Sequence, residues 1–263
     1  MENLESLDTC IRNTVNNFEK IDLKDTGRVK LLKRKDSKYL LNKTKLLNVL
    51  NKLAGSYFIL SIDSEVFQPY TTTYFDTDNF GMYTSHQNGK LNRYKIRKRT
   101  YNRSGQKYVE VKFKNNKKHT IKKREKDTGG NNYFNEKASA FIKEHTPFKP
   151  SDIKKKLTIH YTRFTLVDLN FRERVTIDVN MEYRNDLSKK KINGLVIIEL
   201  KQDIAHKESK IKNILKAEKV YPQSLSKYCL GIASLYDNVK KNRMKKIFLY
   251  IDKLISGRMY KLN

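Results

Sequence analysis

The sequence predicts an α+β fold in which a closed antiparallel β tunnel is flanked by helices. Three observations lead to this fold class. Apolar and polar residues alternate with a period of two through the middle of the chain, the polar positions in these runs are mostly basic, and apolar residues recur at helical spacing near both ends. Because no shift in composition marks a boundary, we expect a single domain over residues 1–263, with a helical N-terminal extension over 1–27 and helices over 207–263.

The first elements are predicted to be two helices with a strand between them. Apolar residues lie at helical spacing in residues 4–20 and again in residues 43–53. Residues 34–41 between them form a short basic run that favours a strand.

From Thr71 the apolar period changes to two, which predicts an antiparallel middle region. The predicted strands lie at residues 74–76, 94–101, 108–114, 120–124, 157–167, 172–182 and 195–201. Turn residues at 127–132 predict a loop, and a short helix is expected over 133–144, before Pro147. Helical spacing returns at 211–215, 230–236 and 244–255, so helices are expected to complete the fold.

Each predicted strand presents one charged face, because alternate residues of a strand point the same way. The residues of these faces are Arg34, Asp36 and Lys38; Lys95, Arg97 and Arg99; Glu110 and Lys112; Lys122 and Arg124; Tyr161 and Arg163; Arg174, Thr176 and Asp178; Glu199 and Lys201. A half-solvated sheet shows the same alternation on any single strand. Like charges facing one another across an open sheet are destabilising, however, so a basic bias shared by seven strands favours closure around water and an anionic guest.

The formal net charge of +28 attracts nucleic acid, anionic lipid, nucleotides or inorganic phosphate chains, and charge alone does not choose among them. The two cysteines, Cys10 and Cys229, have no metal-ligand spacing, which favours a reducing compartment. No apolar run approaches the roughly 20 residues that cross a bilayer, and the N-terminus lacks the order of a secretion signal. We therefore expect a cytoplasmic protein with no membrane span.

Carboxylates within the basic set are candidate ligands for Mg²⁺ or Mn²⁺, which bind through one or two carboxylates together with substrate phosphates. Glu199 is the first candidate and Glu110 the second, and a salt bridge to a neighbouring Lys or Arg is an equal alternative for both. Structural pairing is the better expectation for Asp178 and Asp36.

A series of short motifs follows in a fixed order along the chain. They are Arg34-x-x-x-Lys38-Tyr39, Tyr74-Phe75-Asp76, Lys95-x-Arg97-x-Arg99-x-Tyr101, Val109-Glu110-x-Lys112, Lys122-x-Arg124, Tyr161-x-Arg163, Arg174-x-x-x-Asp178, Glu199-x-Lys201 and Ser226-Lys227-Tyr228. This series, from about Arg34 to Ile232, resembles the catalytic domain of the vacuolar transporter chaperone complex, the VTC domain. That domain is a polyphosphate polymerase of the triphosphate tunnel metalloenzyme superfamily, and the chain looks most like its free-standing bacterial members.

The resemblance implies a closed tunnel in which ATP donates its terminal phosphate to a growing inorganic polyphosphate chain, with Mn²⁺ or Mg²⁺ as cofactor and no specific nucleic acid as partner. The positions that it implies as catalytic are Lys38, Arg97, Arg99, Lys112, Lys122, Arg163, Arg174 and Lys227. Further substrate-binding positions are Tyr161, Ser226, Lys201 and Arg124, and the metal ligands are Glu199 and Glu110.

Two departures from the family pattern bear on the reaction. The superfamily often carries Glu-x-Glu-x-Lys in its first strand, where this chain has Arg34, Asp36 and Lys38, and the loss of a carboxylate argues against activation of water. Ser224 replaces a lysine of the fungal polymerases. Two alternatives stay open: a hydrolase of the same fold acting on tripolyphosphate or nucleoside triphosphate, and a basic module that binds polyanions without turnover.

Overall fold

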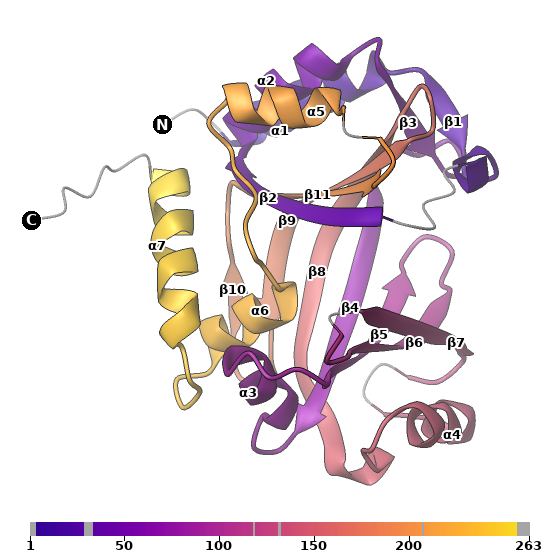
Figure 1. The fold of residues 1–263 in the computed structure, drawn as a ribbon, viewed down its shortest axis with the longest axis vertical. Coiled ribbons are helices and arrows are strands. Elements are labelled where there is room, and N and C mark those ends of the chain that lie inside the picture. Colours follow the sequence, from indigo (N-terminus) through magenta and orange to yellow (C-terminus); the bar gives the residue numbers. More distant parts are fainter. Residues whose placement is uncertain (1–3, 29–33, 118, 131–132, 207, 257–263) are drawn as a thin grey trace, which may run out of the picture.

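The computed structural model describes residues 4–28, 34–117, 119–130, 133–206 and 208–256. Its centre is a curved, mainly antiparallel sheet with the strand order β2-β11-β9-β8-β4-β5-β6-β7 (Figure 1). The strands are β2 (Arg34–Asn42), β4 (Gln68–Thr77), β5 (Arg93–Tyr101), β6 (Lys107–Lys114), β7 (Thr120–Asp127), β8 (Ile153–Asp168), β9 (Glu173–Arg184) and β11 (Leu195–Asp203). Three short strands extend it: β1 (Lys20–Asp22) pairs with β3 (Tyr57–Ser61), β3 with β8, and β10 (Lys189–Lys191) with β9.

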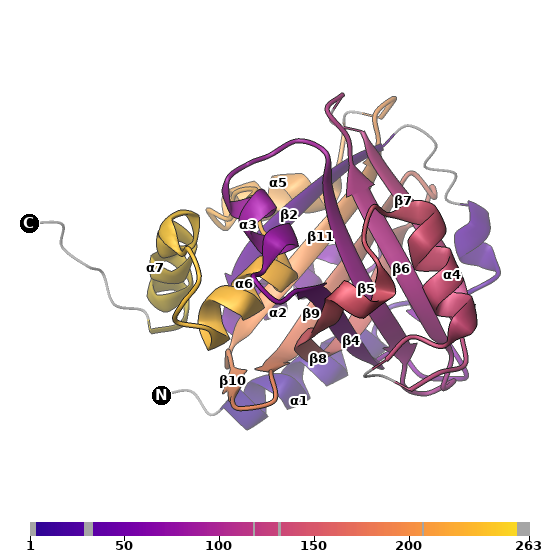
Figure 2. The ribbon, with the colours of Figure 1, turned by 90° about the horizontal axis from the view of Figure 1, so that it is seen from below.

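Helices cover the outer face of this sheet in two places. The first layer, over β2, β11 and β9, is formed by α1 (Leu4–Asn16), α2 (Lys43–Leu53) and α5 (Lys210–Ala217) (Figure 1). The second is α4 (Glu136–His145), which lies against β6 and β7 (Figure 2). The alternating apolar residues of the strands supply both cores: Val196 and Ile198 pack under the first layer, and Val109 and Val111 under α4.

The inner face of the sheet is divided between a polar part and an apolar part. The helices α3 (Gly81–Gln87), α6 (Lys227–Leu235) and α7 (Asn242–Ser256) form one core cluster with inner-face residues of β8 and β9. Gly231 permits this contact, since a Cβ there would lie only 2.6 Å from side-chain atoms of Leu157 and Tyr183. Leu157 and Ile159 point to the same side of β8 as Tyr161 and Arg163, so α6 fills one end of the space that the sheet encloses.

The predicted α+β class with an antiparallel sheet and flanking helices is confirmed. Within the described residues no hydrogen-bonded ladder joins β2 to β7, the two ends of the strand order, although side chains of both strands line one cavity. Residues 1–27, expected to form a helical extension, contain α1 and also the short strand β1, which pairs in parallel with β3. The single domain stays a prediction, and α5, α6 and α7 account for the helices expected after residue 207.

Sequence periodicity located the long elements and missed the short ones. The helix predicted over 43–53 is α2, whose N-terminus is capped by the Asn42 side chain accepting from the Lys45 amide at 2.9 Å. The strands β1, β3 and β10 and the helix α3 were not predicted. Among the described helices, none is long and apolar enough to cross a membrane.

Candidate active site: a cation-lined cavity

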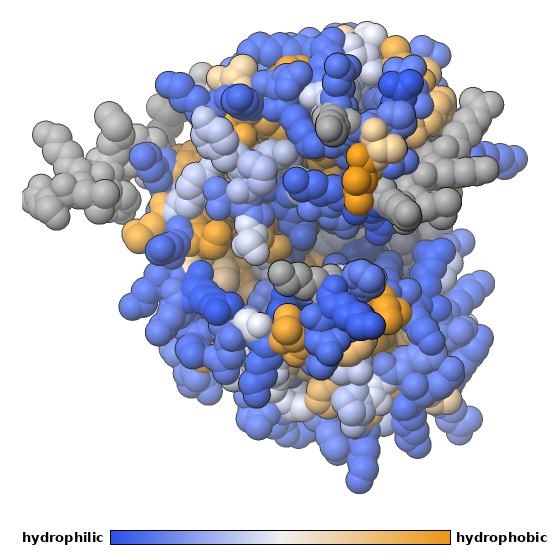
Figure 3. Space-filling view, in the orientation of Figure 1, coloured by the Kyte–Doolittle hydropathy of each residue, from blue (hydrophilic) through white to orange (hydrophobic). Residues whose placement is uncertain are grey.

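A cavity of about 190 Å³ lies against the polar part of the inner face. It receives side chains from β2 at one end of the strand order and from β7 at the other, so the curved sheet wraps around it. Figure 3 shows a recess bordered mostly by hydrophilic residues, between the part of the molecule that holds β2 and the part that holds β5, β6 and β7. Its basic lining residues are Arg34, Lys38, Lys95, Arg97, Arg99, Lys112, Lys122, Arg163, Lys201 and Lys227, and its carboxylates are Asp36 and Glu199.

Three lysines form a row across neighbouring strands in this lining. Lys95 on β5 is the register partner of Lys112 on β6, which is the partner of Lys122 on β7. Burial and the charges of Lys112 and Lys38 lower the pKa of Lys95 to about 8, and the pKa values of Lys112 and Lys122 are also lowered, first by burial. Like charges in facing positions destabilise a sheet, so this row favours an anionic guest.

Glu110 collects several of the cations of β5 and β7. Its carboxylate lies 2.6 Å from Arg97 Nε, 2.5 Å from Lys122 Nζ and 4.0 Å from Arg99 Nη1. Burial alone would raise the pKa of Glu110, but these three cations hold it well below its usual range. Arg97 Nη1 also donates to the Tyr74 hydroxyl at 3.0 Å. Glu110 therefore holds the Arg97 guanidinium in place at the cavity wall.

Asp178 plays the corresponding part on β9. Its carboxylate accepts two hydrogen bonds from Arg163, from Nε at 2.6 Å and Nη2 at 2.9 Å, and also contacts Lys227 Nζ. The side chain is fully buried, which alone would raise its pKa, and the two cations lower the pKa of Asp178 instead. The structural pairing expected for Asp178 is present. It orients a planar guanidinium whose geometry matches phosphate oxygens.

Glu199 is a carboxylate of the lining that forms no ion pair with any described residue. It lies opposite Lys38 on β2 and Thr176 on β9. Burial would raise the pKa of Glu199, but Lys201, Lys38 and more distant cations lower it to about 2. An ionised carboxylate with free oxygens fits a hard divalent cation that takes its other ligands from phosphates. Within the described residues, no group of three or more His, Cys, Asp or Glu side chains could hold a metal by itself. A metal at Glu199 would therefore need phosphate oxygens as further ligands.

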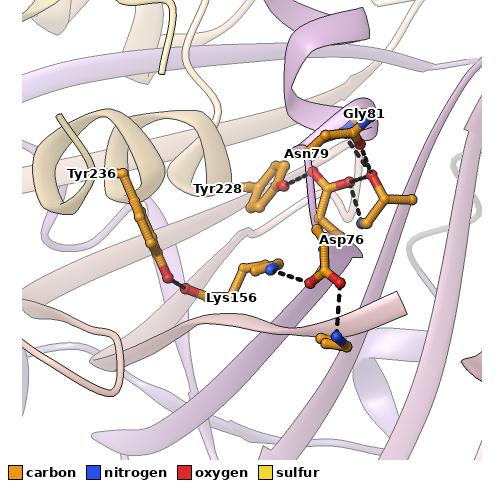
Figure 4. A network of polar contacts seen from close by, with 9 residues as sticks. Asp76, Asn79, Gly81, Lys156, Tyr228 and Tyr236 are labelled. Carbon is orange, nitrogen blue, oxygen red and sulfur yellow. Dashed lines mark hydrogen bonds and ion pairs between the residues drawn. The ribbon is translucent and has the colours of Figure 1, made fainter. Parts of the chain in front are cut away.

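The start of α6 carries two further lining residues, Ser226 and Lys227. The Ser226 hydroxyl accepts a hydrogen bond from Lys95 Nζ at 2.9 Å and caps α6. The Tyr228 hydroxyl donates to the buried Asp76 (Figure 4). Asp76 also accepts hydrogen bonds from two backbone amides of α3 at 2.9 Å each. Asp76, quoted above within a motif, thereby joins α3 to α6 and positions the start of α6.

The far end of α6 is also tied to the sheet. The Tyr236 hydroxyl donates to the backbone carbonyl of Lys156 on β8 at 2.7 Å (Figure 4). Both ends of α6 are thus anchored, and the helix presents Lys227 to the cavity at a defined position.

Most of the residues predicted for the site line the cavity. Those that do are Lys38, Arg97, Arg99, Lys112, Lys122, Arg163, Lys227, Tyr161, Ser226, Lys201 and Glu199. Glu110 stands behind the wall, with its oxygens directed at cations. Arg174 lies beside Lys201 on the same face, and its buried Nε has no hydrogen-bond partner among the described residues. Arg124 is exposed, with its guanidinium 4.9 Å from the centre of the Tyr108 ring.

Seven lining residues were not predicted as site residues: Arg34, Asp36, Thr72, Tyr74, Lys95, Ile159 and Leu225. The alternation pattern placed Arg34 on the same face as Lys38, and Lys95 on the same face as Arg97. This shared face could have identified both as lining residues. Thr72 and Tyr74 share one face of β4 but carry no charge, so the basic pattern did not mark them.

Comparison with known proteins places these observations in a family. A candidate adenylate cyclase from Bacillus halodurans is 13% identical, with a TM-score of 0.48 over 77% of this chain and 96% of its own. A candidate adenylyl cyclase from Hippeastrum, described as having a dominant triphosphatase activity, is 10% identical, with a TM-score of 0.49 over 77% of this chain and 97% of its own. No curated protein matches. The family model of the VTC domain matches residues 33–236, and the chain therefore belongs to the VTC domain family.

Proposed function

We propose that this protein is a polyphosphate polymerase that transfers the terminal phosphate of ATP to a growing inorganic polyphosphate chain inside the cation-lined cavity. The observation that carries this proposal is the excess of basic side chains in the lining, including the facing lysines Lys95, Lys112 and Lys122. Such a row is tolerated when an anionic guest neutralises it. A linear phosphate chain is a guest of opposite charge.

Phosphoryl transfer asks a protein mainly to align donor and acceptor and to neutralise the charge that develops on the transferred group. Arg97 and Arg163 suit this task, because Glu110 and Asp178 hold their guanidinium groups in fixed orientations before any substrate binds. Lys38 and Lys227 add positive charge from the opposite wall and from α6. No nucleophilic side chain is needed.

Glu199 would hold a divalent metal together with phosphate oxygens of the substrate. When bound, Mg²⁺ or Mn²⁺ neutralises charge on the reacting phosphates. Lys38 and Lys201, which flank Glu199 on the inner face, keep its carboxylate ionised and leave its oxygens free.

Transfer to phosphate is supported over transfer to water by the tasks of the remaining carboxylates. A hydrolase needs a group that is free to accept a proton from water. Glu110 and Asp178 are held in ion pairs, and Asp36 accepts from Arg34 Nε at 3.1 Å. Because Glu199 would bind the metal, each of these carboxylates has a role other than accepting a proton from water.

The test is incubation of the purified protein with ATP and Mn²⁺ or Mg²⁺, with acid-stable polymer and orthophosphate measured separately. We expect polymer from the parent, and a loss of about 10²-fold or more in the Arg97→Ala and Glu199→Gln variants. Lys216→Ala, which removes an exposed cation of α5, is the control and should match the parent. Orthophosphate release without polymer would replace the proposal with hydrolysis, and polyphosphate binding without any turnover would replace it with a binding module.

A further inference from the structure

A second cavity of about 590 Å³ adjoins the first and is called here the outer cavity. The two share lining residues, among them Lys38, Lys95 and Lys112, so they lie side by side. The outer cavity adds side chains that have had no role so far: Lys35, Arg93, Lys114 and His86.

The basic residues of the outer cavity have no carboxylate partners in the described part of the chain. Lys35, Arg93 and Lys114 form no ion pair with any described residue, and Arg93 lies directly opposite Lys114 in the register of β5 and β6. The single acidic residue of the lining, Asp36, already accepts from Arg34 outside it. The outer cavity is therefore a site of concentrated positive charge that the protein does not neutralise.

His86 adds a polar group to this lining without adding charge. Its buried Nδ1 has no hydrogen-bond partner among the described residues, and burial together with Lys95 and Arg93 lowers the pKa of His86 to about 3. A neutral imidazole with its proton on Nδ1 can donate a hydrogen bond to a bound anion at this place. Both the charges and this free nitrogen point to an oxyanion ligand.

The two ends of the cavity system differ in chemistry. The tyrosines lie at the end of β5 away from Arg93: the Tyr70 ring stacks on Tyr161 with centroids 5.3 Å apart and lies 5.1 Å from Tyr101. The eight residue steps between Arg93 and Tyr101 correspond to about 27 Å along β5. Among the residues that the structure describes, no Phe, Tyr or Trp side chain lines the outer cavity. Bases of nucleotides and single strands are held by aromatic stacking, so the outer cavity suits a phosphate chain that carries no base.

We propose that the outer cavity binds the inorganic polyphosphate chain at phosphates that lie outside the transfer site. The chain passes from the cation-lined cavity past Lys95 and Lys112 and is held by Arg93, Lys114 and His86. Bound there, it stays on the protein between transfers, so this site governs how long the product becomes. The consequence for product length rests on the proposed function, whereas chain binding does not require turnover.

The test compares the double variant Arg93→Ala/Lys114→Ala with a matched double variant of exposed cations, Lys216→Ala/Lys253→Ala. Equilibrium binding is measured without ATP, using tripolyphosphate, long-chain polyphosphate and an oligonucleotide as probes. We expect the first variant to lose about tenfold or more in affinity for the long chain. The loss for tripolyphosphate should be about twofold or less, because we expect this short ligand to occupy the cation-lined cavity. The matched variant should bind both probes as the parent does.

Three results would overturn the proposal. They are unchanged long-chain affinity in the first variant, an equal loss for tripolyphosphate and the long chain, and a parallel loss for the oligonucleotide. Unfolding midpoints of both variants verify that the fold is retained. Where the parent makes polymer, the first variant should make shorter chains than both the parent and the matched variant. A parent without polymerase activity contradicts the proposed function and leaves the binding result to decide on the site.

Discussion

Replacing Lys95 with methionine is expected to stabilise the protein in the absence of ligand. The pKa of Lys95 falls from 10.5 to about 8, first because of burial. At about 1.4 kcal/mol per pKa unit, this corresponds to about 3 kcal/mol of unfavourable free energy for the charged form. The side chain is half-buried and donates to Ser226, so screening and the lost hydrogen bond reduce the expected net gain to about 1–3 kcal/mol.

The gain should depend on pH with a definite sign. Below pH 8 Lys95 is protonated in both the folded and the unfolded protein, so the full unfavourable free energy of the buried charge is present. Between pH 8 and 10.5 the unfolded chain binds more protons, so the stability of the parent rises relative to that of the variant. Near pH 10.5 the difference between the two proteins should approach zero.

Urea unfolding of the parent and Lys95→Met across this pH interval measures the effect, with Lys216→Met as a control for loss of an exposed charge. Saturating tripolyphosphate should reverse the order, because the parent then gains more from the bound anion. A difference between parent and variant that stays constant with pH would refute the reasoning. So would a Lys95→Met protein that is less stable than the parent at neutral pH.

Two further substitutions test the buried structure around the cavity. Asp178→Asn leaves Arg163 without its ion-pair partner and should lower the free energy of unfolding by about 3–5 kcal/mol. Asp237→Asn at the surface is the control and should change it by about 1 kcal/mol or less. Equal effects of the two substitutions in urea unfolding would contradict the role given to Asp178. Gly231→Ala places a Cβ where α6 meets the sheet and should lower the free energy of unfolding by about 1–3 kcal/mol. Gly27→Ala, where the added Cβ has open space around it, serves as the control. A fully stable Gly231→Ala protein would show that α6 does not pack as described.

The polar faces of the strands were predictable because they depend on local geometry alone. Residues two apart in a strand share a face whatever the rest of the chain does, and Arg97 and Arg99 both reach the cavity as that rule requires. The helix α2 was predictable for the same reason, since its apolar residues repeat at helical spacing. The short strands β1 and β3 contain too few residues to show a period.

The sequence did not predict that Glu110 forms ion pairs whereas Glu199 forms none with the described residues. Glu110 and Glu199 each precede a lysine by two residues and look alike in the pattern. Glu110 lies opposite Arg97 and Arg124 in the sheet, whereas Glu199 lies opposite Lys38 and Thr176. Which carboxylate is paired and which is free is decided by strand register and by the reach of neighbouring side chains.

The position of α6 was likewise hidden. Its sequence is apolar on nearly every side, which predicts a buried helix without showing what it packs against. The structure shows that it occupies part of the inner face, so the space around the cations is shorter than a uniformly polar tunnel would give. This position also brings Ser226 and Lys227 to the cavity wall.

The pattern of paired and unpaired charges follows from what the cavity must do. If every cation were neutralised by a protein carboxylate, a phosphate ligand would displace existing ion pairs and gain little. Glu110 and Asp178 instead fix the guanidinium groups of Arg97 and Arg163, while Lys38, Lys112 and Lys114 are left without carboxylate partners among the described residues. The repulsion that destabilises the empty protein is relieved when an anion binds, so the instability of the free state and the affinity for an anionic ligand are two measures of one interaction free energy.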